Sequence, residues 1–352
     1  MVSVIVPVYN TGRNLERCLK SIHSQTYKDW ECIIVNDCST DVVTIGVMKK
    51  WRRRSSSFIF IDKENNEGVD RARFSGLSVA KGDFLFFVDS DDWLEIDALE
   101  VMVEKAKETD ADMVVGRAHK NYIGGMSKKE LLAPAEWMER VICHEELMDK
   151  YYISFFGCNI LPVNVWATLY RRKLIEKAGL SPCELKFGED LVFNMKLFPC
   201  VQKYFAMNRF VYHYRVGLPL SSNKYLDSWL ENARLLYKVK IQAIEEFAYK
   251  KAEFYQKVEL VNYLKTYVNG CIKFRKERKE EDIDCLQREL KESIYKSLLE
   301  LMNSSYKDKD VVTLLARGDA ESFYELMEQR YMKRPFHQRA LDRIVKIVKG
   351  IT

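Results

Sequence analysis

The chain has 352 residues, which is enough for two domains or for one large domain with an appendage. Hydrophobic residues make up 47% of it, so it can bury a sizeable core, and a formal net charge of +5 gives no electrostatic reason to expect nucleic acid as a partner. None of the nine cysteines forms a CxxC pair, so a zinc knuckle or a redox dithiol is not expected. No signal peptide or long apolar stretch is found, so we expect a cytoplasmic protein with reduced thiols rather than a membrane-spanning chain.

The first part of the chain alternates predicted strands and helices. Five short apolar segments are expected to be strands: residues 2–8, 30–35, 58–61, 84–88 and 113–115. Helical spacing marks the segments between them: residues 15–22, 42–53, 68–80 and 94–109. This alternation predicts an α/β fold with a mostly parallel sheet and helices on both of its faces.

An acidic cluster, residues 89–92 (DSDD), follows the buried strand of residues 84–88 directly. Its three carboxylates repel one another and lose hydration, which is costly unless a cation or hydrogen-bond donors compensate. Carboxylate oxygens suit Mn²⁺ or Mg²⁺, and these ions usually bridge to substrate phosphates, so the cluster favours a metal–diphosphate site. The alternative is that these acids cap a helix starting near Leu94.

Polar residues also follow the first three strands, as YN at residues 9–10, ND at 36–37 and NNEG at 65–68. In a doubly wound sheet these loops and the acidic cluster share one edge, which suggests a single nucleotide-sized site. No GxGxxG follows the first strand and no GxxxxGK[ST] is present, which argues against a dinucleotide-binding Rossmann site and a P-loop ATPase.

Four motifs of this stretch resemble those of family 2 glycosyltransferases. They are VSVIVPVYN at residues 2–10, IIVNDCSTD at 33–41, NEG with AR at 66–68 and 72–73, and AKGDFLFFVDSDD at 80–92. Further on, VWATLYR at 165–171, FGEDLVF at 187–193 and YHYR at 212–215 resemble acceptor-side segments of bacterial members. The resemblance implies a GT-A fold (Rossmann-like, mostly parallel) and transfer of a sugar from a nucleotide diphosphate with inversion at the anomeric carbon.

The resemblance covers residues 1–222, with a nucleotide-binding half at about 1–115 and an acceptor half at about 116–222. On the donor side it implies that Asp91 is the main ligand of Mn²⁺ or Mg²⁺, with Asp89 nearer the ribose and the waters of the metal. It also implies that Asp37 reads the uracil edge.

The turn at Pro7 and Tyr9 would lie against the base, and Asn66 and Arg73 match nucleotide-binding residues of the family. Tyr9 could instead be a core residue with a satisfied hydroxyl, and Arg73 a solvated charge on a helix.

On the acceptor side the resemblance implies that Asp190 is the general base, which takes the proton of the attacking hydroxyl, and that Glu189 orients the site. As an alternative that is compatible with this role, both acids would cap the amphipathic stretch 191–198. Trp166 would stack on an acceptor sugar or pack in the core.

His213 would approach the metal or the diphosphate, as such residues do in some relatives, or be a structural histidine, and Arg215 would contact the diphosphate. Two positions depart from the family pattern. Cys38 stands where glycine is usual, although only glycine adopts a positive φ without strain, and Phe74 stands where asparagine is common.

Helical spacing dominates residues 223–352, for which we expect a helical C-terminal region. Stripes are predicted at Trp229–Phe247 and Val258–Val268, and a third helix is marked by Leu286, Leu290, Ile294 and Leu298. The last segment, residues 331–350, is basic and amphipathic, so it would either contact an anionic membrane or dock on its own protein.

Two functions of different classes stay open. The first is a metal-dependent inverting glycosyltransferase, either a hexosyl- or an N-acetylhexosaminyltransferase. It would use a UDP-sugar and a glycan or lipid-linked acceptor in surface polysaccharide or glycoconjugate synthesis. A homo-oligomer is compatible with this function. The second is a non-catalytic nucleotide-sugar-binding subunit of a glycan assembly complex. Asp91 and Asp190 favour the enzyme, because a subunit that had lost activity would be expected to lose one of them. The GED segment at 188–190 argues against a third idea, a nucleotidyltransferase.

Overall fold

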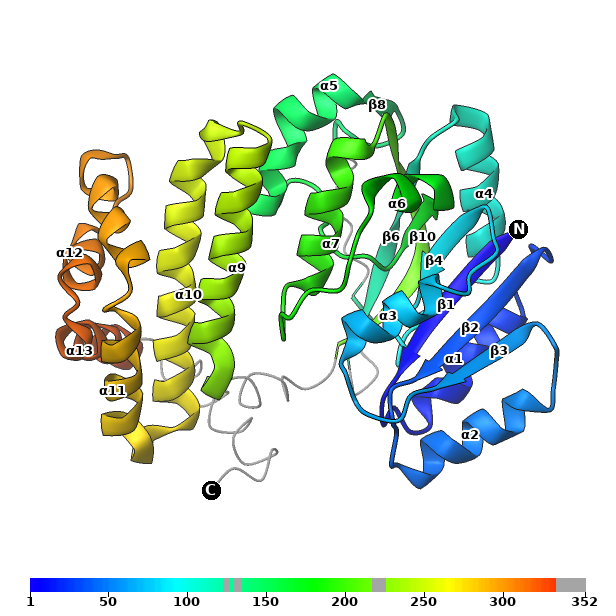
Figure 1. Ribbon diagram of the computed structural model, residues 1–352, viewed down its shortest axis with the longest axis horizontal. Helices are drawn as coiled ribbons and strands as arrows, with labels where there is room; N and C mark the ends of the chain where they lie inside the picture. The colour runs from blue at the N-terminus through cyan, green and yellow to red at the C-terminus, as the bar shows by residue number, and fades with distance from the viewer. Residues whose placement is uncertain (123–126, 129–134, 217–225, 334–352) are drawn as a thin grey trace. The chain divides into compact units, whose positions relative to one another are not determined.

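The first four expected strands lie side by side in one sheet (Figure 1). In the computed structural model they are β1 (Val2–Val8), β2 (Trp30–Asn36), β3 (Phe58–Asp62) and β4 (Phe84–Phe87). They pair in parallel in the order β3-β2-β1-β4. Their carboxyl ends therefore meet at one edge, where the predicted polar loops follow them.

The structure describes residues 1–122, 127–128, 135–216 and 226–333, which fall into two compact units. The α/β unit comprises Met1–Phe155, Ile160–Glu184 and Gly188–Gly217. The helical unit comprises Phe156–Asn159, Leu185–Phe187 and Leu218–Thr352.

The sheet continues beyond β4 through an antiparallel strand. β9 (Thr168–Arg171) lies between β4 and β6 (Met113–Tyr122) and is antiparallel to both, while β6 pairs in parallel with β10 (Lys203–Val216). Three short strands are antiparallel to their neighbours: β5 (Trp93–Leu94) and β8 (Val141–Cys143) on β10, and β7 (Ser127–Lys128) on β6. Strands β1 to β4, β6 and β10 thus run in one direction, which confirms the predicted mostly parallel sheet.

Helices cover both faces of this sheet. Those described before β10 are α1 (Asn14–His23), α2 (Val42–Arg52), α3 (Val69–Leu77), α4 (Ala98–Thr109), α5 (His144–Glu146), α6 (Arg172–Ala178) and α7 (Glu189–Leu197), with π and 3-10 turns at Leu147–Tyr151, Tyr152–Phe156 and Phe198–Cys200. On one face, Val4 of β1 joins a buried cluster with Leu19 of α1 and Leu99 of α4. On the other face, α3 approaches β1 so closely that Gly76 lies against Ile5.

The helix expected from Leu94 begins four residues later, at Ala98. Leu94 is instead part of β5, where it pairs with Tyr212 of β10, and the amide of Glu95 donates to the carbonyl of Val211 at 3.0 Å. The prediction was wrong because the pairing partner lies far along the chain. The acidic cluster therefore precedes a strand and does not cap a helix.

The helical unit packs its own core. Its elements are α9 (Leu226–Glu246), α10 (Glu253–Phe274), α11 (Lys279–Glu289), α12 (Lys309–Arg317) and α13 (Ala320–Met332), with 3-10 segments at Lys250–Ala252, Lys276–Arg278 and Ser293–Asn303. The stripe with Val261, Leu264 and Val268 is buried, as predicted. The third predicted helix is divided, because Glu292 is extended (ψ 139°) between α11 and the following 3-10 segment.

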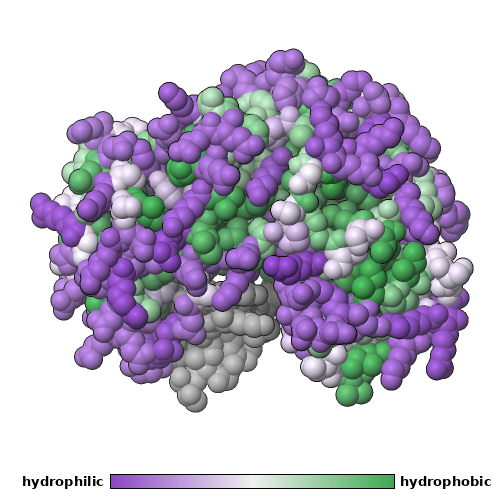
Figure 2. Space-filling view, in the orientation of Figure 1, coloured by the Kyte–Doolittle hydropathy of each residue, from purple (hydrophilic) through white to green (hydrophobic). Residues whose placement is uncertain are grey.

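Within the described residues, the helices are too short or too polar to cross a membrane. On the face drawn in Figure 2, hydrophilic residues predominate and hydrophobic ones show in patches between them, as expected when amphipathic helices turn their apolar sides inward. The basic segment predicted at 331–350 lies outside the described residues, apart from residues 331–333.

The close approach of α3 to β1 predicts a specific cost for a methyl group at Gly76. A Cβ there would lie 2.5 Å from Cγ2 of Ile5, whereas one at Gly46, an exposed position of α2, would meet nothing within 4 Å. We expect Gly76→Ala to destabilise the protein by about 1–2 kcal/mol, because overpacking outweighs the gain in helix propensity. We expect the matched Gly46→Ala to stabilise it by about 0.5–1 kcal/mol. Calorimetric unfolding checks both, and equal shifts in melting temperature would contradict the close packing.

Candidate active site

The loops after β1 and β2 are tied together by Asn10. Its Oδ1 accepts from the amides of Thr40 at 2.8 Å and Asp41 at 2.9 Å, and its own backbone adopts a positive φ of 49°. Tyr9, just before it, is 47% exposed, so the interpretation as a buried core residue was wrong. Pro7 is buried within β1 and pairs with Val35. The turn therefore presents Tyr9 at the carboxyl edge of the sheet.

Asp37 is buried, and its carboxylate binds the loop after β3. Its two oxygens accept from the amides of Glu67 at 3.0 Å and Gly68 at 2.8 Å, and Lys63 lies 3.3 Å away. Asn66, in the same loop, is exposed. A carboxylate oxygen can accept more than one hydrogen bond. Asp37 can therefore hold this loop and also accept a hydrogen bond from a ligand.

The three acids of the cluster have different environments. Asp92 is fully buried: Oδ2 accepts from the Tyr212 hydroxyl at 2.8 Å, and Oδ1 accepts from the amide of Arg215 at 2.7 Å. Burial, followed by the charge of Asp89, raises the pKa of Asp92 to about 8. The oxygen of Tyr212 also accepts from the amide of Asp89 at 3.1 Å, so Asp92 and Tyr212 fix the acidic cluster to β10.

Asp91 is the open member of the cluster, with its side chain 42% exposed. Nη1 of Arg215 lies 3.5 Å from its carboxylate, and Nη2 of Arg17 donates to its carbonyl at 3.4 Å. Arg17 also lies over the ring of Trp93, 3.4 Å from its centre. These contacts place two cations beside an accessible carboxylate.

Arg73 joins the cluster to the amino end of α7. Its Nη2 donates to Oδ1 of Asp89 at 3.0 Å, and its Nη1 donates to Oδ1 of Asp190 at 2.5 Å. The side chain is only 5% exposed, so the interpretation as a solvated charge was wrong. Burial opposes the charged guanidinium, but the carboxylates of Asp190 and Asp89 outweigh it and raise the pKa of Arg73. Burial also raises the pKa of Asp89.

Glu189 and Asp190 form the first turn of α7, after Gly188 with its φ of 86°. Oδ2 of Asp190 accepts from the amide of Val165 at 3.3 Å. Glu189 lies 3.8 Å from Nη1 of Arg73, and burial, followed by the charge of Asp190, raises the pKa of Glu189 to about 7.

Trp166 lies between the end of β4 and β10. Its backbone forms an isolated parallel β-bridge with Phe87. Its ring stacks with the rings of Tyr212 and Tyr214, with ring centres 5.1 Å and 5.2 Å apart. It is half-buried and lines a cavity of about 170 Å³ with mostly apolar walls. Part of its aromatic surface is therefore already covered by the protein.

His213 does not face the acidic cluster. Its Nε2 lies 2.9 Å from Glu95, and its ring stacks on Trp93 at 4.7 Å between ring centres. Its Nδ1 lies 3.3 Å from Nδ2 of Asn121, so both ring nitrogens contact residues outside the acidic cluster.

Sequence reasoning gave no role to three residues that build this site. Tyr212 holds the acidic cluster, Arg17 contacts Asp91, and Asn194 of α7 fixes the loop before Trp166 through the carbonyls of Val163 and Asn164. A polar Asn194 on a buried helix face was an available signal, since buried amides are normally hydrogen-bonded.

Comparison with known proteins defines the class. Residues 3–179 match Glycosyl transferase family 2, so the chain belongs to this family, and the fold described above is that of a GT-A glycosyltransferase. It is 32% identical over 230 residues to the glycosyltransferase GlyA of Streptococcus pneumoniae, covering 65% of this chain but only 32% of GlyA. It is 30% identical over 276 residues to EpsH of Bacillus subtilis, covering 77% of this chain and 76% of EpsH.

Solved structures share the fold. S. aureus TarS 1–349 in complex with UDP superimposes with a TM-score of 0.64 at 20% identity, over 95% of this chain and 92% of that chain. The mannosyltransferase PcManGT from Pyrobaculum calidifontis, in complex with GDP-Man and Mn²⁺, superimposes with a TM-score of 0.52 at 15% identity, over 99% of this chain and 86% of that chain.

The Arg73 bridge predicts a large loss of stability when the cation is removed. In Arg73→Met, Asp89 and Asp190 would face each other without their shared partner, which we expect to cost about 3–5 kcal/mol. Adding Asp190→Asn should recover part of this loss, because it removes one of the unpaired charges. Arg71→Met, at an exposed position of the same helix, should change stability by less than about 0.5 kcal/mol. Chemical denaturation checks the set; equal effects of the two arginine variants would contradict the bridge.

The raised pKa of Glu189 predicts a pH-dependent stability. The folded protein holds this proton more tightly than the unfolded chain, so stability falls as the pH rises from about 4.5 through about 7. We expect Glu189→Gln to stabilise the protein by about 1–3 kcal/mol at pH 8 and by much less at pH 5. The exposed Glu184→Gln serves as control. Melting temperatures at the two pH values measure the difference, and a pH-independent effect of Glu189→Gln would refute it.

Proposed function

We propose that the chain transfers a sugar from a UDP-sugar to a hydroxyl group of a glycan or lipid-linked acceptor in bacterial surface-glycan synthesis, with inversion at the anomeric carbon. The observation that carries the proposal is the position of Asp190, which shares the guanidinium of Arg73 with Asp89. This arrangement brings a candidate base next to a candidate diphosphate site, as a single displacement requires.

Support for the donor and the process comes from relatives. TarS has been solved with UDP and with UDP-GlcNAc, and the chain is 28% identical over 228 residues to TarP of Staphylococcus aureus, a poly(ribitol-phosphate) beta-N-acetylglucosaminyltransferase. The family and the shared fold make a UDP-sugar the first donor to test.

The donor side would be formed by the loops at the sheet edge. Tyr9 is exposed there and suits packing against a base, while Asp37 and Asn66 belong to the loops that would surround the nucleotide. Arg215 and Arg17 lie beside Asp91 and would attract a diphosphate.

The residues present fit a hard divalent cation. Asp91 offers an accessible carboxylate, and Asp89 has a raised pKa because burial makes its charge costly, which a bound cation would relieve. When bound, Mn²⁺ or Mg²⁺ would neutralise charge on the leaving diphosphate.

Asp190 would accept the proton of the acceptor hydroxyl as that oxygen attacks the anomeric carbon. Arg73 and the amino end of α7 stabilise negative charge at this position. Glu189 would orient the site, and the exposed part of Trp166 would contact the acceptor. We propose that residues 1–222 carry the reaction, and that a lipid-linked acceptor would be met at a membrane surface.

The test is release of UDP from a panel of UDP-sugars, with water as acceptor, with and without MnCl₂. We expect one donor to be hydrolysed in a metal-dependent manner, with turnover reduced about 10²–10⁴-fold in Asp190→Asn and in Asp91→Ala. Asp110→Asn, at an exposed site on the end of α4, is the matched control and should keep full turnover.

UDP binding by calorimetry separates the outcomes. Binding that is retained in Asp190→Asn and lost in Asp91→Ala would support the separate roles of the two acids. UDP binding without turnover of any donor would favour a non-catalytic binding subunit, and failure to bind UDP at all would refute the proposed donor.

A further inference from the structure

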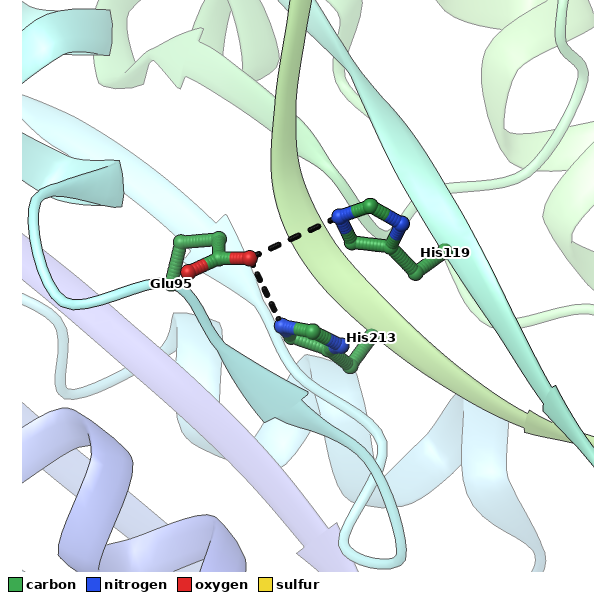
Figure 3. A group of neighbouring side chains, drawn as sticks. All are labelled: Glu95, His119 and His213. Carbon is green, nitrogen blue, oxygen red and sulfur yellow. Dashed lines mark hydrogen bonds and ion pairs between the residues drawn. The ribbon is translucent and has the colours of Figure 1, made fainter. Parts of the chain in front are cut away.

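Three potential metal ligands lie close together near the end of β5. They are Glu95, directly after β5, His119 of β6 and His213 of β10 (Figure 3). Oε1 of Glu95 lies 2.9 Å from Nε2 of His213 and 3.5 Å from Nε2 of His119. Both imidazoles thus direct the same kind of nitrogen toward one carboxylate oxygen.

These distances suit a tetrahedral ion. With nitrogen and oxygen ligands at about 2.0–2.1 Å, neighbouring ligand atoms of a tetrahedral ion are about 3.3–3.4 Å apart. The two separations from Glu95 lie on either side of this value, and all three ligand atoms lie within 4.8 Å of one another.

The two rings are already held in place by stacking. His119 stacks on Phe210, with ring centres 4.0 Å apart and planes at 10°, and His213 stacks on Trp93 at 4.7 Å and 8°. Ring orientation therefore needs little further ordering, which lowers the cost of binding.

We propose that Glu95, His119 and His213 bind a borderline-soft divalent ion of the Zn²⁺ class, separate from the donor cation. Two imidazoles and one carboxylate favour Zn²⁺ over Mg²⁺, which prefers oxygen ligands. Two of the side chains keep a partly exposed surface, 36% for Glu95 and 19% for His213, so water can supply a fourth ligand.

The site differs from the candidate donor site in its members. Asp91 does not belong to the group of ligand atoms that lie within 4.8 Å of one another.

The ion would act as a clip on the segment that carries the acidic cluster. β5 has two residues and pairs with β10 only through Tyr212 and His213. A metal held by Glu95, His119 and His213 would link the end of β5 to both β6 and β10. Asp91 and Asp92 directly precede β5, so the clip would stabilise their position.

The experiment uses the untagged full chain after treatment with a chelator. Binding of ZnCl₂ is measured by titration calorimetry, and binding of CoCl₂ is measured by visible absorption. We expect one Zn²⁺ per chain without nucleotide, a tetrahedral Co²⁺ spectrum, and a higher melting temperature with Zn²⁺. Glu95→Gln and His119→Gln should weaken binding by more than about tenfold while keeping a native circular dichroism spectrum. His144→Gln, whose ring contacts the carbonyl of Val201, is the matched control and should bind normally.

Asp91→Asn distinguishes this site from the donor cation, because it should lose Mn²⁺-dependent nucleotide release and keep Zn²⁺ binding. The proposal is overturned if the wild type binds no Zn²⁺, if Glu95→Gln and His119→Gln bind it as the wild type does, or if Asp91→Asn abolishes binding. None of these results depends on turnover, so they stand apart from the test of the proposed function.

Discussion

The candidate site depends on one buried cation, the guanidinium of Arg73. It is tied to Asp89 after β4 and to Asp190 at the start of α7, so it joins two segments separated by 101 positions of the chain. Its single positive charge cannot neutralise all the carboxylates around it, since Glu189 also lies 3.8 Å from its Nη1. Burial is the main reason why the pKa values of Asp89 and Glu189 are raised, and the excess negative charge of three carboxylates around one cation adds to it. The donor cation proposed above would offset this excess of negative charge.

The three acids of the DSDD cluster differ in burial and therefore in the contacts that they make. Asp92, fully buried and bonded to Tyr212 and the amide of Arg215, anchors the segment. Asp89 reaches Arg73, and Asp91 stays open. A buried carboxylate with fixed partners limits the motion of its neighbours, and this gives the open one a defined position before any ligand binds. The same anchoring strand, β10, carries His213, one of the two histidines of the proposed zinc-class site.

Most of the α/β fold could be predicted because its signals are local. Each strand of the parallel part is a short apolar run, and each site loop follows its strand directly. What failed depends on distant pairing. β5 exists because Leu94 meets Tyr212, and no local pattern shows that contact. The direction of His213 is similar: β10 is irregular against β6 between Ala206 and Tyr212, and such a shift changes which side chains face the site. Arg73 could be matched to a family motif, but its burial between two acids became visible only in three dimensions.

Cys38 shows how a local cost is met by the surrounding site. Its φ of 60° is the conformation that favours glycine, and a side chain there costs about 1–2 kcal/mol. The loop is nevertheless held on both sides: Oδ1 of Asn36 accepts from the amide of Ser39 at 3.0 Å, and Asn10 binds the two following amides. These bonds fix the turn regardless of the residue at its centre. Since Asp37 directly precedes Cys38 and binds the loop after β3, the turn conformation determines where that carboxylate lies. Cys38 thus has the positive φ that a glycine would adopt without strain, and the loops at the carboxyl edge of the sheet keep their connections around it.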